Sequence, residues 1–182
     1  MTDGIKILNE KKVYENAYGS LFDDEVSFTS SGTKGSYVRW SWKAPYSVAI
    51  LPLVSPSEAV LIESFRHSAR KLTIEVPKGF GESDAEPFEV ATKELTEETG
   101  LRSDNLEYLG VTFADPAFAN QPMHLFIAHN CEPGNANHET SEAIVGLKNV
   151  RIAANVDLMK SEVADAISLL LISIAIARVA VK

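Results

Sequence analysis

The chain has 182 residues, of which 45% are hydrophobic and 23% charged, and its formal net charge is −8. This length suits one domain with at most a small appended piece, and the composition excludes wholesale disorder. The acidic balance argues against nucleic acid as a partner, because binding to the phosphate backbone needs a basic surface.

The first half of the chain is predicted to form strands. Partly alternating segments, separated by turns rich in glycine and serine, lie at 13–15, 21–28 and 37–43. Two apolar, β-branched segments at 47–54 and 59–65 are joined by Ser55-Pro56-Ser57 and predict a hairpin in the core. Another strand is expected at 72–76.

A helix is predicted from Pro87 to Thr99. Proline is favoured in a first helical turn, and Gly100 suits the left-handed position that follows a last turn. Phe88, Ala91 and Leu95 recur at helical spacing and are expected to form one buried stripe.

More strands and a second helix are predicted beyond Gly100. The strands are expected at 106–113, 123–129 and 144–152, with a polar loop at 132–141 and a helix from about 162 to 179. Strands on both sides of a helix favour an α/β domain in which a mixed sheet packs between helices.

The sequence predicts a cytoplasmic protein without a membrane partner. The longest apolar run, 166–177, is shorter than the roughly 20 residues that cross a bilayer. The first residues lack the apolar stretch of a secretory signal. Cys131 is the single cysteine, so no intramolecular disulfide can form.

Acidic side chains are concentrated around the first predicted helix. Seven acidic residues and one basic residue lie between Glu82 and Glu98. Glu94, Glu97 and Glu98 share one helix face, at the end where the helix dipole is negative. Either water or a bound cation has to offset this repulsion. Carboxylates without His or Cys favour magnesium or manganese.

Residues 79–101 resemble the Nudix box, G-x5-E-x7-R-E-U-x-E-E-x-G-U, where U is a bulky aliphatic residue. Seven of its nine fixed positions match: Gly79, Glu94, Leu95, Glu97, Glu98, Gly100 and Leu101. The resemblance implies that Glu94, Glu97 and Glu98 bind Mg²⁺ or Mn²⁺ and that Glu98 also acts in catalysis. Ala85 replaces the box glutamate, and Lys93 replaces the arginine that orients a metal-binding glutamate in the family.

Most of the chain resembles the ADP-ribose pyrophosphatase branch of the same family. Ser64-Phe65-Arg66 and Ile74-Glu75-Val76-Pro77-Lys78-Gly79 are similar to its Q-[YF]-R and W-E-[LV]-P-A-G stretches. The resemblance implies that Arg66 and Glu75 bind substrate, with Arg66 on the diphosphate. It also implies that the backbone carbonyl of Lys78, at a position where the branch usually has alanine, binds the metal.

Three later positions carry the same resemblance. Pro116 lies 15 residues after Leu101, the spacing associated with ADP-ribose enzymes, which implies a substrate-binding position. Residues 138–144 resemble the segment that carries the catalytic carboxylate, for which Glu142 fits best and Glu139 second. Asp165 matches the aspartate of an Asp-x-Lys pattern found in hydrolases of nucleoside diphosphate sugars, but the lysine is absent.

The resemblance implies a Nudix-like α/β/α sandwich with a mixed sheet at 45–182, preceded by a small N-terminal β subdomain at 1–44 that forms a homodimer. The implied reaction is metal-dependent hydrolysis of the diphosphate bond of ADP-ribose or a related nucleoside diphosphate sugar, a small-molecule substrate. The products are a nucleoside monophosphate and a sugar phosphate. Two alternatives stay open: an NDP-sugar hydrolase acting on, for example, GDP-mannose, and a nucleotide-binding Nudix module whose turnover is weakened.

Other chemistries lack a signal. The four histidines show no zinc-ligand spacing, and no dinucleotide fingerprint is complete. Trp40 and Trp42 are expected to pack structurally, with one of the two rings on a given side of their strand.

Overall fold

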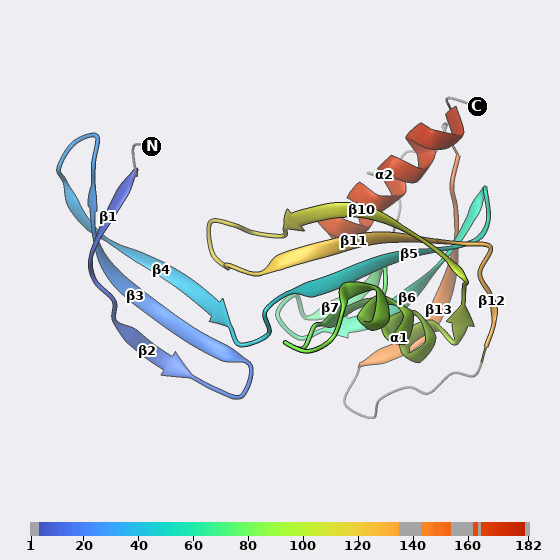
Figure 1. The fold of residues 1–182 in the computed structure, drawn as a ribbon, viewed down its shortest axis with the longest axis horizontal. Coiled ribbons are helices and arrows are strands. Elements are labelled where there is room, and N and C mark those ends of the chain that lie inside the picture. Colours follow the sequence, from blue (N-terminus) through green and yellow to red (C-terminus); the bar gives the residue numbers. More distant parts are fainter. Residues whose placement is uncertain (1–3, 135–142, 154–161, 164, 181–182) are drawn as a thin grey trace.

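The computed structural model describes residues 4–134, 143–153, 162–163 and 165–180, which form an N-terminal sheet and a larger sheet flanked by two helices (Figure 1). The elements in chain order are β1 Ile5–Asn9, β2 Lys12–Glu15, β3 Gly19–Phe28, β4 Lys34–Trp42, β5 Ser47–Ser55, β6 Glu58–Arg66, β7 Lys71–Glu75, β8 Lys78–Phe80, α1 Pro87–Thr99, β9 Leu101–Arg102, β10 Asn105–Phe113, β11 Pro122–His129, β12 Glu132–Pro133, β13 Ile144–Arg151 and α2 Ala166–Ala180.

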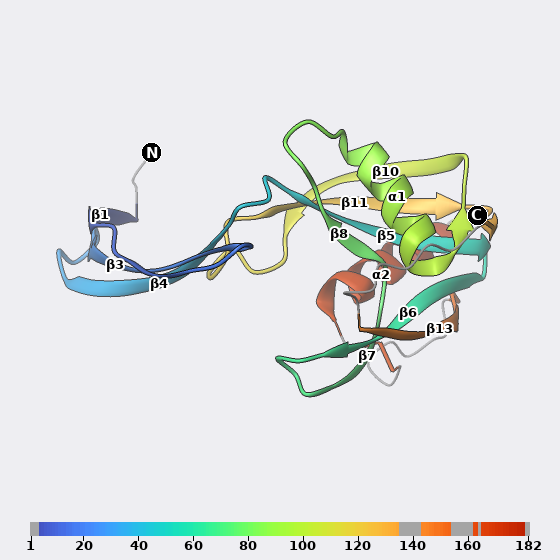
Figure 2. The ribbon, with the colours of Figure 1, turned by 90° about the horizontal axis from the view of Figure 1, so that it is seen from below.

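The N-terminal sheet is antiparallel and is built around β3. Strands β1 and β2 both pair with β3, as does β4 over its whole length. Figure 2 shows this sheet as a single layer that extends away from the rest of the molecule. Its contacts with the larger body include a hydrogen bond from the Trp40 backbone N–H to the Phe118 carbonyl at 2.8 Å.

The larger sheet is mixed, as predicted. Its main path runs β10-β11-β5-β6-β13, with β7 paired to β6 and β8 paired to β5. Strand β11 lies parallel to β5, whereas the other pairs in this sheet are antiparallel. The predicted hairpin of β5 and β6 is confirmed, and its strands meet through Leu53 opposite Ala59.

Strand β5 packs against both helices. Ala49, Leu51 and Leu53 belong to a core cluster that includes α2. Val48 and Ile50 belong to a second cluster that includes α1. Because successive side chains of a strand point to opposite faces, the apolar run of β5 fills both cores. The α/β/α sandwich predicted from the sequence is therefore confirmed, with α1 and α2 on opposite sides of the sheet (Figure 2).

Three expectations about single elements were wrong. Phe88 is 49% exposed, and the buried apolar side chains of α1 are those of Val90, Ala91 and Leu95. Helix α2 begins at Ala166 rather than near residue 162. The expected polar loop begins with β12, a two-residue strand that pairs with β9. A strand of two residues shows no hydrophobic periodicity from which it could be predicted.

The described parts of the chain contain no helix that is both long and apolar enough to cross a membrane.

Candidate active site

The C-terminal half of helix α1 carries the acidic cluster predicted from the sequence, Glu94, Glu97 and Glu98. Its predicted bounds, Pro87–Thr99, are confirmed, and Gly100 takes the left-handed conformation with φ 68°. Within these bounds the last turn has no basic residue. Glu94 is 8% exposed and Glu98 is 5% exposed, so two acidic residues are buried near the negative end of the helix dipole.

These two carboxylates face β8. The backbone N–H of Lys78 donates a hydrogen bond to Glu98 Oε2 at 3.0 Å. Gly79 packs so closely on Glu94 that a Cβ at this glycine would lie 1.9 Å from Glu94 Oε1. Because glycine has no side chain, the Glu94 carboxylate can occupy the space next to residue 79. Two separate points of α1 are held against consecutive residues of β8.

The other carboxylate of the cluster has a basic partner. Lys93 Nζ lies 3.5 Å from Glu97 Oε2, one helical turn away. This is the lysine that replaces the arginine of the family pattern, and it contacts a carboxylate predicted to bind metal. Ala85, the other departure, packs against the α1 core, and its carbonyl accepts a hydrogen bond from the Tyr46 hydroxyl.

The donor chemistry of α1 suits a hard divalent cation. Glu94, Glu97 and Glu98 supply carboxylate oxygens, and Lys78 adds a backbone carbonyl on the neighbouring strand. Within the described ranges, no three His, Cys, Asp or Glu side chains converge into a ready-made metal cluster. The assignment of these four residues as metal ligands stays a prediction.

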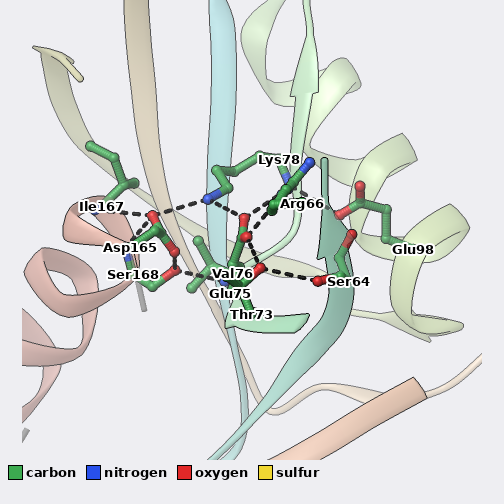
Figure 3. Close-up of polar contacts among 10 residues, drawn as sticks. All are labelled: Ser64, Arg66, Thr73, Glu75, Val76, Lys78, Glu98, Asp165, Ile167 and Ser168. Carbon is green, nitrogen blue, oxygen red and sulfur yellow. Dashed lines mark hydrogen bonds and ion pairs between the residues drawn. The ribbon is translucent and has the colours of Figure 1, made fainter. Parts of the chain in front are cut away.

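Arg66 and Glu75 form a bidentate ion pair beside this cluster (Figure 3). Arg66 Nε lies 2.8 Å from Glu75 Oε1, and Arg66 Nη2 lies 2.7 Å from Glu75 Oε2. The geometry fixes the plane of the guanidinium. These hydrogen bonds are also the main reason that the pKa of Arg66 is raised.

The Glu75 carboxylate is buried and strongly held in its charged form. Burial raises its pKa, but hydrogen bonds from Arg66 and the charge of Lys78 outweigh that effect and lower the pKa to about 2. Thr73 supports the pair through its hydroxyl, which contacts Glu75 and lies 3.1 Å from the Ser64 carbonyl oxygen. Glu75 is therefore an anion that orients two cations.

A cavity of about 620 Å³ opens next to these groups. Its lining residues come from both sheets, from the turn between β6 and β7, from the loop after β10 and from the residue before α2: Trp42, Ser47, Arg66, Ser68, Glu75, Lys78, Gly79, Phe80, Ala114, Asp115, Ala119, Gln121, Met123 and Asp165. The volume suits a small ligand. Charged groups and aromatic rings share its wall, as a nucleotide-like ligand would need.

The tryptophans differ from the expectation. The rings of Trp40 and Trp42 lie 5.5 Å apart in an edge-on contact, so both face the same side of β4. Residues i and i+2 of a strand share a face, and the expectation that only one ring would face a given side was wrong. Trp42 also contacts Phe80, with 4.9 Å between ring centroids. Both rings line the cavity, so the N-terminal sheet contributes to the cavity wall through Trp42.

The remaining predicted site residues are only partly placed. Pro116 lies in an exposed turn, and its neighbour Asp115 lines the cavity. Glu139 and Glu142 lie outside the described residues. The side chains of Lys78 and Asp165, for which the sequence predicted no site role, form an ion pair at 3.0 Å at the cavity wall.

Comparison with known proteins identifies a domain and several relatives. The family model described as NUDIX domain matches residues 43–168. A methanol dehydrogenase activator from Bacillus methanolicus is 30% identical over 125 residues, which cover 68% of this chain and 65% of that protein, just under two thirds of its length. An ADP-ribose pyrophosphatase from Bacillus subtilis (strain 168) is 29% identical over 163 residues, 88% of this chain and 86% of that protein.

The fold has a close counterpart among solved structures. The crystal structure of an ADP compounds hydrolase superposes with a TM-score of 0.77 and 19% sequence identity, covering 95% of this chain and 92% of that one. The Escherichia coli (strain K12) protein named ADP compounds hydrolase NudE is 22% identical over 138 residues, 76% of this chain and 73% of that protein.

Proposed function

The chain belongs to the Nudix hydrolase superfamily, and on this premise we propose that it hydrolyses the diphosphate bond of ADP-ribose or a related nucleoside diphosphate sugar. The products are a nucleoside monophosphate and a sugar phosphate. One observation carries the proposal: the buried carboxylates of α1 lie directly against β8, whose Lys78 and Gly79 line the cavity that also holds Arg66. The relatives named for ADP-ribose and ADP compounds support this substrate class.

Each part of this site has a role in the proposed reaction. Arg66, oriented by Glu75, binds diphosphate oxygens through its planar guanidinium. Glu94, Glu97, Glu98 and the carbonyl of Lys78 would hold Mg²⁺ or Mn²⁺. Such an ion, when bound, neutralises diphosphate charge and lowers the pKa of water. Glu142, or Glu139 as the second choice, is proposed to take the proton from the attacking water.

The first experiment tests the reaction itself. Purified protein is incubated with ADP-ribose, GDP-mannose or UDP-glucose, either with magnesium or with EDTA, and the nucleotides are separated by chromatography. We expect AMP and ribose 5-phosphate from ADP-ribose only when magnesium is present. Absence of any metal-dependent monophosphate would rule out the proposed hydrolysis. Monophosphate from GDP-mannose alone would instead support the alternative sugar hydrolase.

A single substitution tests the role of Glu98. Glu98→Gln keeps an amide oxygen for the Lys78 N–H but removes the charge. We expect turnover to fall about 100-fold or more, the order found when one catalytic electrostatic contact is lost. Glu132→Gln, a change at an exposed residue of β12, serves as the control and should keep the wild-type rate. A fully active Glu98→Gln would refute the metal-site assignment.

The weakened binding module remains the second candidate because Ala85 and Lys93 depart from the family pattern. It predicts that ADP-ribose binds without metal-dependent products. The division into a dimer-forming subdomain at 1–44 and a hydrolase domain at 45–182 is also proposed, supported by a family match that begins at residue 43. A cytoplasmic location stays a prediction from the sequence.

A further inference from the structure

The side chain of Lys78 lies between two carboxylates (Figure 3). Its Nζ is 2.8 Å from Glu75 Oε2 and 3.0 Å from Asp165 Oδ1. The side chain is 17% exposed and lines the cavity of about 620 Å³. A long, flexible lysine is thus held in one position at the wall of the proposed substrate site.

Lys78 and Arg66 are neighbours because they share one oxygen. Arg66 Nη2 and Lys78 Nζ both contact Glu75 Oε2, at 2.7 and 2.8 Å. The two cations are therefore side by side, and both line the cavity. Glu75 and Asp165 balance their charges, so this part of the wall carries no net charge before an anion arrives.

Asp165 is itself fixed by α2. Its Oδ1 accepts the backbone N–H groups of Ile167 at 3.1 Å and Ser168 at 3.2 Å, as an N-cap aspartate does. Its Oδ2 accepts the Ser168 hydroxyl, and that hydroxyl oxygen accepts the Val76 N–H at 2.8 Å. Ser168 is fully buried. The start of α2 is thereby tied to the β7–β8 connection.

We propose that the Lys78 ammonium is a second substrate-binding cation beside Arg66, and that Asp165 is a positioning residue that holds it there. The inference rests on the proposed function. An ammonium has three protons, and its two partners among the described residues leave one for a ligand oxygen. A compact cation next to a planar guanidinium suits the several oxygens of a diphosphate. The family resemblance assigns only the backbone carbonyl of residue 78, so this role belongs to the side chain.

The test compares binding with turnover. Lys78→Met keeps the backbone N–H to Glu98 and an apolar stem but removes the charge. We expect the KM for ADP-ribose with magnesium, and the Kd for ADP-ribose in EDTA by calorimetry, to rise about tenfold, as for one lost charge-assisted hydrogen bond. The kcat should change much less, because the contact is present in bound substrate and transition state alike. Lys148→Met is the control, because the Lys148 side chain lies on β13, is 42% exposed and does not line the cavity.

Asp165→Asn tests the positioning role, since its amide oxygen can still cap α2. KM should rise in the same direction by a smaller factor, because Glu75 still holds Lys78. In the Lys78→Met background, Asp165→Asn should cause no further rise in KM. Effects that multiply would overturn the positioning role. A purely structural role would lower the melting temperature and leave KM unchanged.

The outcomes separate this inference from the proposed function. If the wild type hydrolyses ADP-ribose while Lys78→Met keeps its wild-type KM and Kd, the inference is overturned and the hydrolase assignment stands. If the wild type hydrolyses none of the three substrates, the hydrolase assignment fails. The Kd in EDTA then still decides whether Lys78 binds the nucleotide, since it needs no turnover.

Discussion

Gly79 sets the position of Glu94 by having no side chain. A methyl group at residue 79 would overlap the Glu94 side chain, so in Gly79→Ala the Glu94 carboxylate has to move away from the position that it occupies beside β8. We expect activity to fall about 100-fold, as for a misplacement of about 1 Å in an active site. The free energy of unfolding should drop by only about 1–3 kcal/mol. Steady-state kinetics and thermal unfolding measure the two effects.

Gly146→Ala is the matched control, because the added methyl group would lie 3.5 Å from the nearest neighbouring atom, Glu63 Oε2. It should retain nearly full activity. If Gly79→Ala is as active as this control, the close packing of Gly79 on Glu94 has no part in placing the carboxylate.

Residues close together in the sequence were easier to predict than pairs formed by the fold. Glu94 and Glu98 could be found because a helix repeats every 3.6 residues, and their shared face follows directly. Arg66 was found by resemblance to a family motif. The contact between Lys78 and Asp165 has no local signal, because it forms only when α2 returns to the β7–β8 connection. A lysine between Pro77 and Gly79 and an aspartate before a helix would ordinarily be taken as solvated.

Helix α2 packs against one face of the sheet through its buried apolar side chains. Leu171 is fully buried in the core cluster with β5, whereas Leu170 is 39% exposed. We expect Leu171→Ala to lower the free energy of unfolding by about 2–5 kcal/mol. Leu170→Ala removes the same atoms from the helix surface and should cost less than about 1 kcal/mol. Chemical denaturation of both variants checks the assignment. Equal losses would mean that α2 packs in another rotation.

The two helices differ in how well the sequence predicted their ends. Pro87 and Gly100 mark both ends of α1, and the predicted bounds were correct. The start of α2 was placed too early because Val163 extends the apolar pattern of the helix toward the N-terminus. The capping residue is Asp165, whose carboxylate takes the first backbone N–H groups. The hydrophobic pattern alone does not locate a cap.

The N-terminal sheet leaves apolar side chains exposed on both of its faces. Ile7 and Val38 are 56% and 49% exposed, and their strands present them on opposite faces of the sheet. Exposed apolar side chains of this kind favour a protein–protein interface, and the family resemblance implies that the partner is a second copy of the chain. We therefore expect light scattering to give a mass of twice 19.9 kDa.

Ile7→Lys and Val38→Lys test one face each, and the change on the covered face should shift the mass to that of one chain. Neither change alters a side chain of the larger sheet or its helices. A wild-type protein that is monomeric at micromolar concentration would contradict the dimer. The mixed sheet between helices was predicted from strands on both sides of a helix, and the α/β/α sandwich from the family resemblance. The sequence did not predict that the N-terminal sheet extends away from the sandwich. Local sequence patterns show which faces of a strand are apolar, but not whether another layer packs on them.

Strand β5 gives the whole molecule one further property. Its alternate side chains belong to the clusters of both helices, and it pairs in parallel with β11 across a long stretch of chain. Residues of β11 also belong to both clusters, so the cores beneath the two helices are complete only when this distant strand pair has formed. Contacts of high sequence separation of this kind slow folding. Both layers therefore depend on the same strand, and a substitution on either face of β5 acts on the sheet that the opposite helix packs against.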